Sequence, residues 1–155
     1  NASGINDGAS AAVIMSKQKA AELGIIPLMK LVTSVAVGVD PQIMGIGPAE
    51  AIPVALEKAG WNFDEVDYWE LHEAFALQFI GCKIRLKEKY GMDLLMDKVN
   101  HNGSGIALGH PIGSSGLRIV VSLYYELERL GLTKGGASTC VGTGPAMASL
   151  WTRDI

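Results

Sequence analysis

Cysteine is scarce in this sequence, and so are long apolar runs. Cys82 and Cys140 are the only two cysteines, and neither has metal-like spacing to other ligand residues, which argues against a disulfide framework and a zinc site. No stretch approaches the ~18 uninterrupted apolar residues of a membrane span, and the first residues lack the basic, apolar pattern of a secretion signal. We therefore expect each cysteine to be a buried filler or a working thiol in a reducing compartment.

Charge and aromatic residues are also limited. Charged residues make up 19% and aromatic residues 6% of the 155 residues, with a net charge of −3, so nothing predicts a nucleic acid or an anionic membrane as partner. The 48% of apolar residues excludes disordered, collagen-like and coiled-coil chains and suffices for one buried core. Glycine is abundant, with 19 residues, which predicts backbone placed tightly around something.

Strand-like and helix-like segments alternate along the chain, which predicts an α/β fold with a largely parallel sheet. Leu28 to Val37 has the apolar, β-branched character of a strand covered on both faces. Pro53 fits a helix only if it lies in the first turn. The expected strands are 9–15, 28–37, 66–71, 137–140 and 146–151, and the expected helices are 17–23, 49–59, 74–90 and 117–130. One helical stripe is expected to contain Phe75, Phe79, Cys82, Leu86 and Tyr90.

Three loops that follow strands or precede a helix carry reactive side chains. They are His72-Glu-Ala-Phe75, Gly109-His-Pro111 and Cys140-Val-Gly-Thr-Gly144, and ligands gather at the carboxyl ends of strands in such sheets. Each loop alone is a weak signal, since a loop histidine often only caps or faces water and a strand-end cysteine often only packs. The glycine-rich stretch misses the dinucleotide-binding pattern by one residue, and there is no phosphate loop or nucleophile elbow.

Together and in this order, the three loops resemble the C-terminal half of a thiolase. The stretch Asn102-Gly-Ser-Gly-Ile-Ala-Leu-Gly-His-Pro-Ile-Gly113 carries much of the resemblance, which extends upstream to Gly38–Pro48 and to Asn1-Ala-Ser-Gly-Ile-Asn-Asp-Gly-Ala9. The resemblance implies a thiolase-like layered α/β fold, with a mixed, largely parallel five-stranded sheet flanked by helices. It also implies that residues 1–25 end the N-terminal thiolase half and that residues 26–155 form the C-terminal domain.

The resemblance assigns roles to four residues. Thiolases join or cleave a carbon–carbon bond between two acyl units carried on coenzyme A, and Cys140 corresponds to the acid/base cysteine. His110 corresponds to the histidine that activates the nucleophilic cysteine and helps bind the thioester oxygen. His72 corresponds to a position, Asn in many thiolases, that helps hold the water or the enolate oxygen. Gly142 corresponds to a backbone N–H donor of the second oxyanion hole.

Further residues are assigned to the acyl pocket or to structure. Met44, Ala74 and Phe75 lie where the family lines its acyl pocket, although Phe75 also fits the helix stripe. His101 has no catalytic counterpart, and Cys82 lies mid-stripe on a helix, so both are expected to be structural. The chain departs from the common Cys-Ile-Gly-Gly-Gly form at its Cys140-Val-Gly-Thr-Gly-Pro145 loop, which leaves Gly142 in place.

The nucleophilic cysteine belongs to the family's N-terminal half, and nothing in this sequence matches it. The resemblance therefore implies the C-terminal domain of a longer enzyme, which with its N-terminal half performs the reversible Claisen condensation of two acetyl-CoA to acetoacetyl-CoA and CoA. Longer-chain 3-ketoacyl-CoA thiolases, the ketosynthase branch and a non-catalytic assembly module remain as alternatives. We also expect acyl-CoA substrates, no separate cofactor, and assembly as a homodimer or homotetramer. The expected location is the cytoplasm, with the organelle matrix as the alternative.

Overall fold

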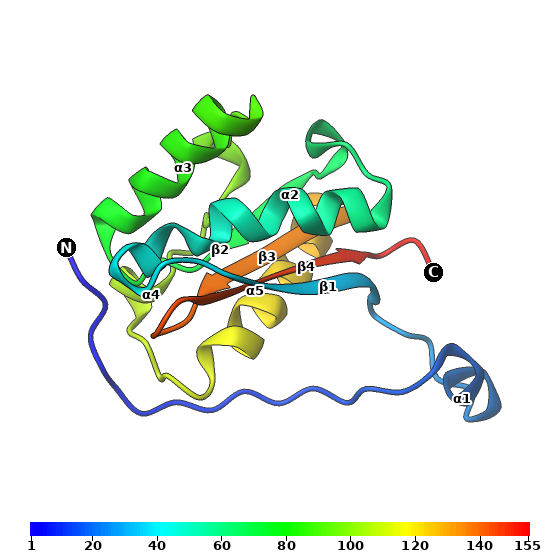
Figure 1. The fold of residues 1–155 in the computed structure, drawn as a ribbon. Helices are drawn as coiled ribbons and strands as arrows, with labels where there is room; N and C mark the ends of the chain where they lie inside the picture. The colour runs from blue at the N-terminus through cyan, green and yellow to red at the C-terminus, as the bar shows by residue number, and fades with distance from the viewer.

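The computed structural model describes all 155 residues and contains four strands and five α-helices joined by short 3₁₀ turns (Figure 1). In chain order the elements are α1 (Lys17–Glu22), β1 (Lys30–Gly38), η1 (Pro41–Ile46), α2 (Gly47–Ala59), η2 (Phe63–Glu65), β2 (Tyr68–Leu71), α3 (Ala76–Tyr90), η3 (Met96–Lys98), α4 (Gly105–Leu108), α5 (Ser115–Leu130), β3 (Lys134–Cys140) and β4 (Pro145–Thr152). None of the helices is long and apolar enough to cross a membrane.

The sheet has four strands in the order β1-β4-β3-β2. Only β2 and β3 run parallel, with Leu71 opposite Ser138, while β4 is antiparallel to both β3 and β1. The expectation of a mixed sheet is confirmed, but the expectation of five largely parallel strands is wrong. A tight turn joins β3 to β4, and a connection that short can only make an antiparallel hairpin.

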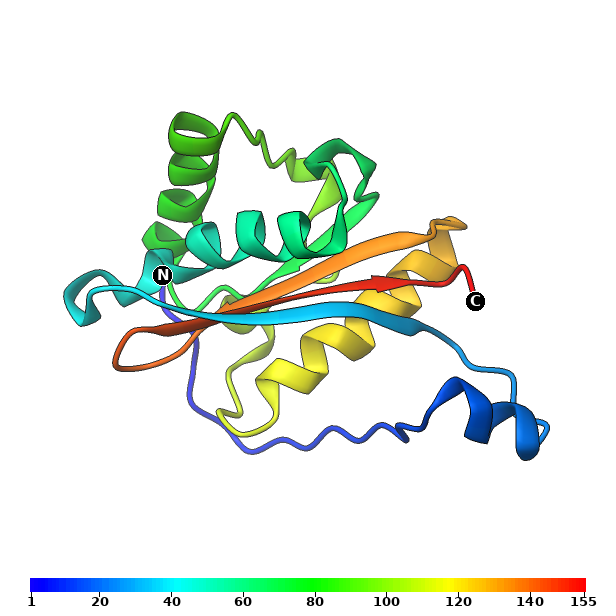
Figure 2. The ribbon, with the colours of Figure 1, turned by 45° about the vertical axis from the view of Figure 1, so that its right-hand side comes forward.

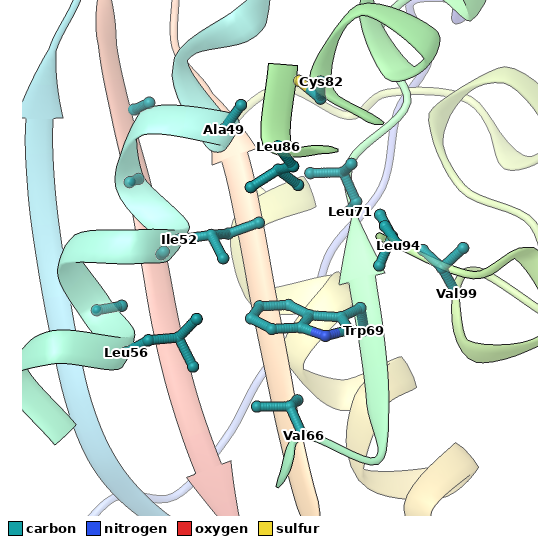
Figure 3. Packing of buried hydrophobic residues seen from close by; sticks show 14 of the residues in the cluster. Ala49, Ile52, Leu56, Val66, Trp69, Leu71, Cys82, Leu86, Leu94 and Val99 are labelled. Carbon is teal, nitrogen blue, oxygen red and sulfur yellow. The ribbon is translucent and has the colours of Figure 1, made fainter. Parts of the chain in front are cut away.

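Helices cover the two faces of this sheet unequally (Figure 2). On one face α2 and α3 pack over a large core cluster around Trp69, Ile52 and Leu86, and Figure 3 shows these side chains converging on the indole ring. On the other face α5 packs against β2 and β3 through Ile119, Leu123 and other apolar residues. The face of β1 and β4 beside α5 has no helix over it.

The segment expected to form a strand at residues 9–15 does not pair with any strand. Residues 9–15 lie in an extended, largely exposed segment that precedes α1, and they take part in none of the strand pairings. The strand at Lys30–Gly38 exists, but its only buried residue is Thr33. The other residues of this edge strand are exposed or half-buried, so the expectation that both of its faces are covered is wrong.

Two expectations about helices also need correction. Pro53 lies in the interior of α2, not in its first turn, and the helix continues because its buried face, including Ile52 and Leu56, packs on the sheet. Phe75 does not begin the α3 stripe, since it precedes the helix and is 46% exposed. The rest of the stripe is as expected, with Phe79, Cys82 and Leu86 buried and Tyr90 half-buried.

Candidate active site

His72 lies directly beyond the end of β2 and is almost fully buried. Its backbone N–H donates to the Ser138 carbonyl at 2.9 Å, which extends the parallel ladder between β2 and β3 by one step. Neither ring nitrogen has a hydrogen-bond partner, although both are shielded from solvent. Buried polar atoms are almost always paired in proteins, so an unpaired, buried imidazole suits a side chain that binds a ligand.

His110 lies in the loop between α4 and α5, and residues on α5 hold this loop. The Nδ1 atom of His110 is 2.6 Å from Oγ of Ser115, and that hydroxyl donates to the Pro111 carbonyl at 3.1 Å. With its proton used in this way, Ser115 accepts from Nδ1–H, so the basic lone pair of His110 lies on Nε2. Three residues further along α5, Arg118 donates to the Gly109 carbonyl at 2.8 Å.

The two imidazoles lie against each other, with ring centroids 4.4 Å apart. Burial, helped by the neighbouring His110 and Arg118, lowers the pKa of His72 to about 4. Burial and the charge of Arg118 also lower the pKa of His110. Both rings are therefore neutral at pH 7, and each offers one N–H donor and one lone pair.

Cys140 ends β3 at the same end of the sheet. It stands two residues beyond Ser138, the residue that bonds His72, so the parallel register brings the cysteine and His72 to adjacent strand ends. The thiol is free, and burial raises its pKa above the ordinary value. Burial outweighs the backbone hydrogen bond that favours the thiolate, so within this chain Cys140 is protonated more readily than a thiol in water.

The hairpin after Cys140 presents a free backbone donor. The N–H of Gly142 makes no hydrogen bond, while its neighbours Val141 and Gly144 both donate within the turn. Gly142 is exposed, so its N–H is accessible to a ligand, as an oxyanion-hole donor requires. A side chain at Gly144 would overlap the Val39 carbonyl, which explains why that position of the turn has no side chain.

The N-terminal arm, residues 1–10, ties the two histidine loops together. It donates from Ser3 N–H to the Ala74 carbonyl at 2.8 Å, and it accepts the His110 N–H at the Gly4 carbonyl at 2.7 Å. Ser10 adds a hydroxyl contact of 2.8 Å to Ser114, at the start of α5. The arm thus contacts the loop that follows His72 and both ends of the loop that carries His110.

The three residues expected to line an acyl pocket surround the start of α3. Ala74 is buried, Phe75 is exposed and forms a bridge with Ala2, and half-buried Met44 lies in η1. The segment η1 contacts α3, where Cys82 bonds the Gly45 carbonyl at 3.3 Å. The role of these three residues in acyl binding stays a prediction.

His101 and Cys82 agree with their expected structural roles. His101 Nδ1 lies 2.6 Å from Oε1 of buried Glu126, and its Nε2 lies 2.8 Å from the Asp97 carbonyl, so the ring holds its loop against α5. Cys82 is fully buried. No three or more His, Cys, Asp or Glu side chains gather closely enough to hold a metal ion.

Sequence reasoning missed the residues that support the histidines, namely Ser115, Arg118 and Asn100. Ser115 and Arg118 are three apart on α5 and contact the same loop, a spacing that places side chains on one helix face. That spacing is visible in the sequence, but nothing in the sequence indicates which loop the two side chains reach. Asn100 lies in a loop beside β2, and its contacts depend entirely on the tertiary fold.

The comparisons with known proteins agree on one family. The family described as "Thiolase, C-terminal domain" matches residues 25–153. The chain is 52% identical to the acetyl-CoA acetyltransferase of Syntrophomonas wolfei over 148 residues, which cover 96% of this chain and 36% of that protein.

Solved structures show the same similarity in three dimensions. The crystal structure of the Bacillus anthracis acetyl-CoA acetyltransferase superimposes with a TM-score of 0.92 at 50% identity, covering 98% of this chain and 37% of that one. The crystal structure of human mitochondrial 3-ketoacyl-CoA thiolase in complex with CoA superimposes with a TM-score of 0.81 at 39% identity, covering 88% of this chain and 33% of that one. The chain thus spans about a third of the length of each relative.

Proposed function

Because this chain belongs to the thiolase family as its C-terminal domain, we propose that it supplies half of the active site of an acetyl-CoA acetyltransferase. The reaction is the reversible condensation of two acetyl-CoA molecules to acetoacetyl-CoA and CoA. The observation that carries the proposal is the contact between buried His72 and half-buried His110, with ring centroids 4.4 Å apart, at the sheet end where Cys140 terminates β3.

The proposed reaction begins with transfer of an acetyl group from CoA to a cysteine outside this chain. Nε2 of His110 accepts the proton of that thiol, because Ser115 holds Nδ1 as the protonated nitrogen. The new C–S bond forms as the bond between acetyl and CoA breaks, and CoA leaves as a thiol. Cys82 cannot replace the missing nucleophile, since it is fully buried in the core.

In the second half-reaction the Cys140 thiolate removes a proton from the methyl group of another acetyl-CoA. The enolate carbon then attacks the acetyl group on the nucleophilic cysteine, the carbon–carbon bond forms, and that cysteine leaves. A neutral His72 donates a hydrogen bond to the enolate oxygen, directly or through water, and the Gly142 N–H stabilises the second oxyanion. One such donor contributes about 3 to 4 kcal/mol to transition-state stabilisation in comparable enzymes.

The raised pKa of the Cys140 thiol favours the protonated form at neutral pH. A protonated thiol suits the cleavage direction, in which acetyl-CoA leaves as an enolate and takes a proton from Cys140. In the condensation direction the thiol must first lose its proton. After CoA has left as a thiol, the neutral Nε2 of His110 accepts that proton, and it gives the proton to the nucleophilic cysteine when that cysteine leaves the condensation product.

About two thirds of the relatives' own length lies outside the part that this chain matches, which supports the existence of an N-terminal half that packs against this chain. Beside α5, the uncovered face of the sheet forms a groove of about 220 Å³ lined mainly by apolar side chains such as Ile119, Met147 and Trp151. We propose that an N-terminal thiolase half covers this face and brings the nucleophilic cysteine to the sheet end. This proposal includes the assignment of residues 1–25 to that half and assembly as a homodimer or homotetramer.

Acetyl-CoA is the proposed substrate because the acetyl-CoA acetyltransferases give the higher identities, about 50% against 39% for the 3-ketoacyl-CoA thiolase. A longer-chain 3-ketoacyl-CoA thiolase is the second candidate, favoured by the exposed Phe75 beside the expected acyl pocket. We propose a cytoplasmic location, in keeping with two free cysteines and no disulfide, with an organelle matrix as the alternative.

The test uses the complete enzyme, in which this chain is joined to an N-terminal thiolase half, either its own or that of the Syntrophomonas wolfei relative. The complete enzyme should cleave acetoacetyl-CoA with CoA, and the 155-residue chain alone should not. Cys140→Ala should keep covalent labelling by radioactive acetyl-CoA and lose solvent deuterium exchange into the acetyl methyl group. A Cys140→Ala enzyme that loses labelling but keeps exchange would show that Cys140 is the nucleophile.

A further inference from the structure

No hydrogen bond fixes the orientation of the His72 imidazole, because both ring nitrogens lack a partner. Its position therefore depends on the backbone on either side and on close packing. Gly105 provides part of that packing, since a Cβ there would lie 2.8 Å from Cε1 of His72. Asn100 bonds both residues that flank His72, through the backbone of Leu71 and the side chain of Glu73.

The amide of Asn100 bonds both residues that flank His72. Its Oδ1 accepts from Leu71 N–H at 2.9 Å, and its Nδ2 donates to the Leu71 carbonyl at 2.7 Å. The same Nδ2 donates its other proton to Oε1 of Glu73 at 2.7 Å. Both amide protons and the amide oxygen of Asn100 are thus used, and every one of these bonds goes to a neighbour of His72.

The location of these bonds explains why they are needed. β2 is a four-residue edge strand, so the outer side of Leu71 has no strand to pair with. Asn100 supplies the missing donor and acceptor at that position. Its own N–H donates to the Trp69 carbonyl at 3.2 Å, which aligns the loop with the strand edge.

The backbone of Asn100 restricts which residues can do this. Its φ is 52°, in the left-handed region that Gly, Asn and Asp adopt most easily. Gly has no side chain to bond Leu71, and Asp cannot donate to the Leu71 carbonyl or to the Glu73 carboxylate. Only asparagine combines the backbone conformation with a group that both donates and accepts.

We propose that Asn100 is a positioning residue for His72, whose amide sets where that imidazole meets the enolate oxygen of the second acetyl-CoA. The inference rests on the proposed function, in which His72 is the enolate donor. Ser104, whose hydroxyl accepts the Glu73 N–H at 3.2 Å, supports the same loop from the other side.

Asn100→Gly is the decisive variant in the complete enzyme, because it permits the left-handed backbone and removes only the amide. Deuterium exchange into the methyl group of acetyl-CoA should fall about 10- to 100-fold, since small misplacements of a catalytic group cost rates of this order. Covalent labelling by acetyl-CoA should stay within about twofold of wild type, because that step uses His110. The matched control is Asn62→Ala, which removes an amide-to-glutamate bond of 3.1 Å at Glu65, outside the site.

Asn100→Asp provides a second test that does not depend on the first. It sets a carboxylate against the Leu71 carbonyl and Glu73, so exchange should fall further than in Asn100→Gly. Adding Glu73→Gln restores a donor opposite the new carboxylate and should recover part of the exchange.

The outcomes separate this inference from the function on which it rests. Wild-type exchange in the Asn100→Gly enzyme, or an equal loss of labelling and exchange together with a lower unfolding temperature, would overturn the positioning role. An absence of recovery in the double variant would also count against it. If the wild-type complete enzyme shows no exchange and no thiolysis, the proposed function fails, and the role of Asn100 fails with it.

Discussion

Acid should destabilise this protein through His72, and replacing that residue should remove the effect. Burial lowers the pKa of His72 from 6.5 to about 4, so between these pH values the unfolded chain binds a proton that the folded chain does not. Stability therefore falls as the pH decreases through this window. A pKa difference of one corresponds to about 1.4 kcal/mol, so the free energy of unfolding should fall by about 3 kcal/mol near pH 4.

The difference between wild type and His72→Asn isolates this contribution. Burial raises the pKa of Glu70 to about 8, so the folded state binds the additional proton there and stability from Glu70 rises as the pH falls. The two effects oppose each other in the wild-type curve. Asparagine at position 72 keeps a neutral donor and does not titrate, so subtracting the two curves leaves the His72 term alone.

Urea unfolding of both proteins at several pH values from 7 to 4 measures that difference. The free energy of unfolding of wild type should decrease relative to His72→Asn by about 2 to 3 kcal/mol over this range. His101→Asn, at a histidine in a separate network, should leave the His72 window in place. Parallel curves for wild type and His72→Asn would refute the reasoning, and so would a His72 ring that takes up its proton near pH 6.5 in nitrogen-detected NMR.

Three further predictions concern the site and the core. Gly136→Ala should cost about 1 to 3 kcal/mol in urea unfolding, because a methyl group there would overlap the buried Trp69 ring; unchanged stability would contradict the tight contact. Ser115→Ala should slow acetyl labelling of the complete enzyme at least about tenfold, because the tautomer of His110 is no longer fixed; labelling at the wild-type rate would exclude that role. Deuterium exchange should rise with pH above neutrality, since burial raises the pKa of Cys140 and its thiolate is the proposed base; a flat profile from pH 7 to 10 would assign the proton to another group.

The parts of the fold that could be predicted are those governed by local sequence. The helix that ends at Gly91 and the helix that ends at Gly131 follow from their apolar spacing and from glycines with φ of 68° and 66°. The three reactive loops were also located correctly, because each follows or precedes an element whose own pattern is clear. His72 and His110 were expected at the same sheet end, and their 4.4 Å separation confirms it.

The rest could not be predicted because it depends on contacts between distant segments. The apolar run at residues 9–15 has the composition of a strand, but it pairs with neither edge strand of the sheet, β1 or β2. The order of the strands places β4 between β1 and β3, and no local pattern encodes that. The contacts of Asn100 with Leu71 and Glu73 join residues 29 and 27 positions apart, so a single asparagine in a loop gave no signal.

The segment that matches the family is shorter than the segment that positions the two histidine loops, because the N-terminal arm lies outside the match. The family match begins at residue 25, whereas the carbonyl that accepts the His110 N–H belongs to Gly4. A protein shortened to the matching residues would keep the cluster around Trp69 and lose the tether between the two histidine loops. Folding and the arrangement of the two histidine loops should therefore respond separately to shortening, and an alignment boundary is a poor guide to where such a protein can be cut.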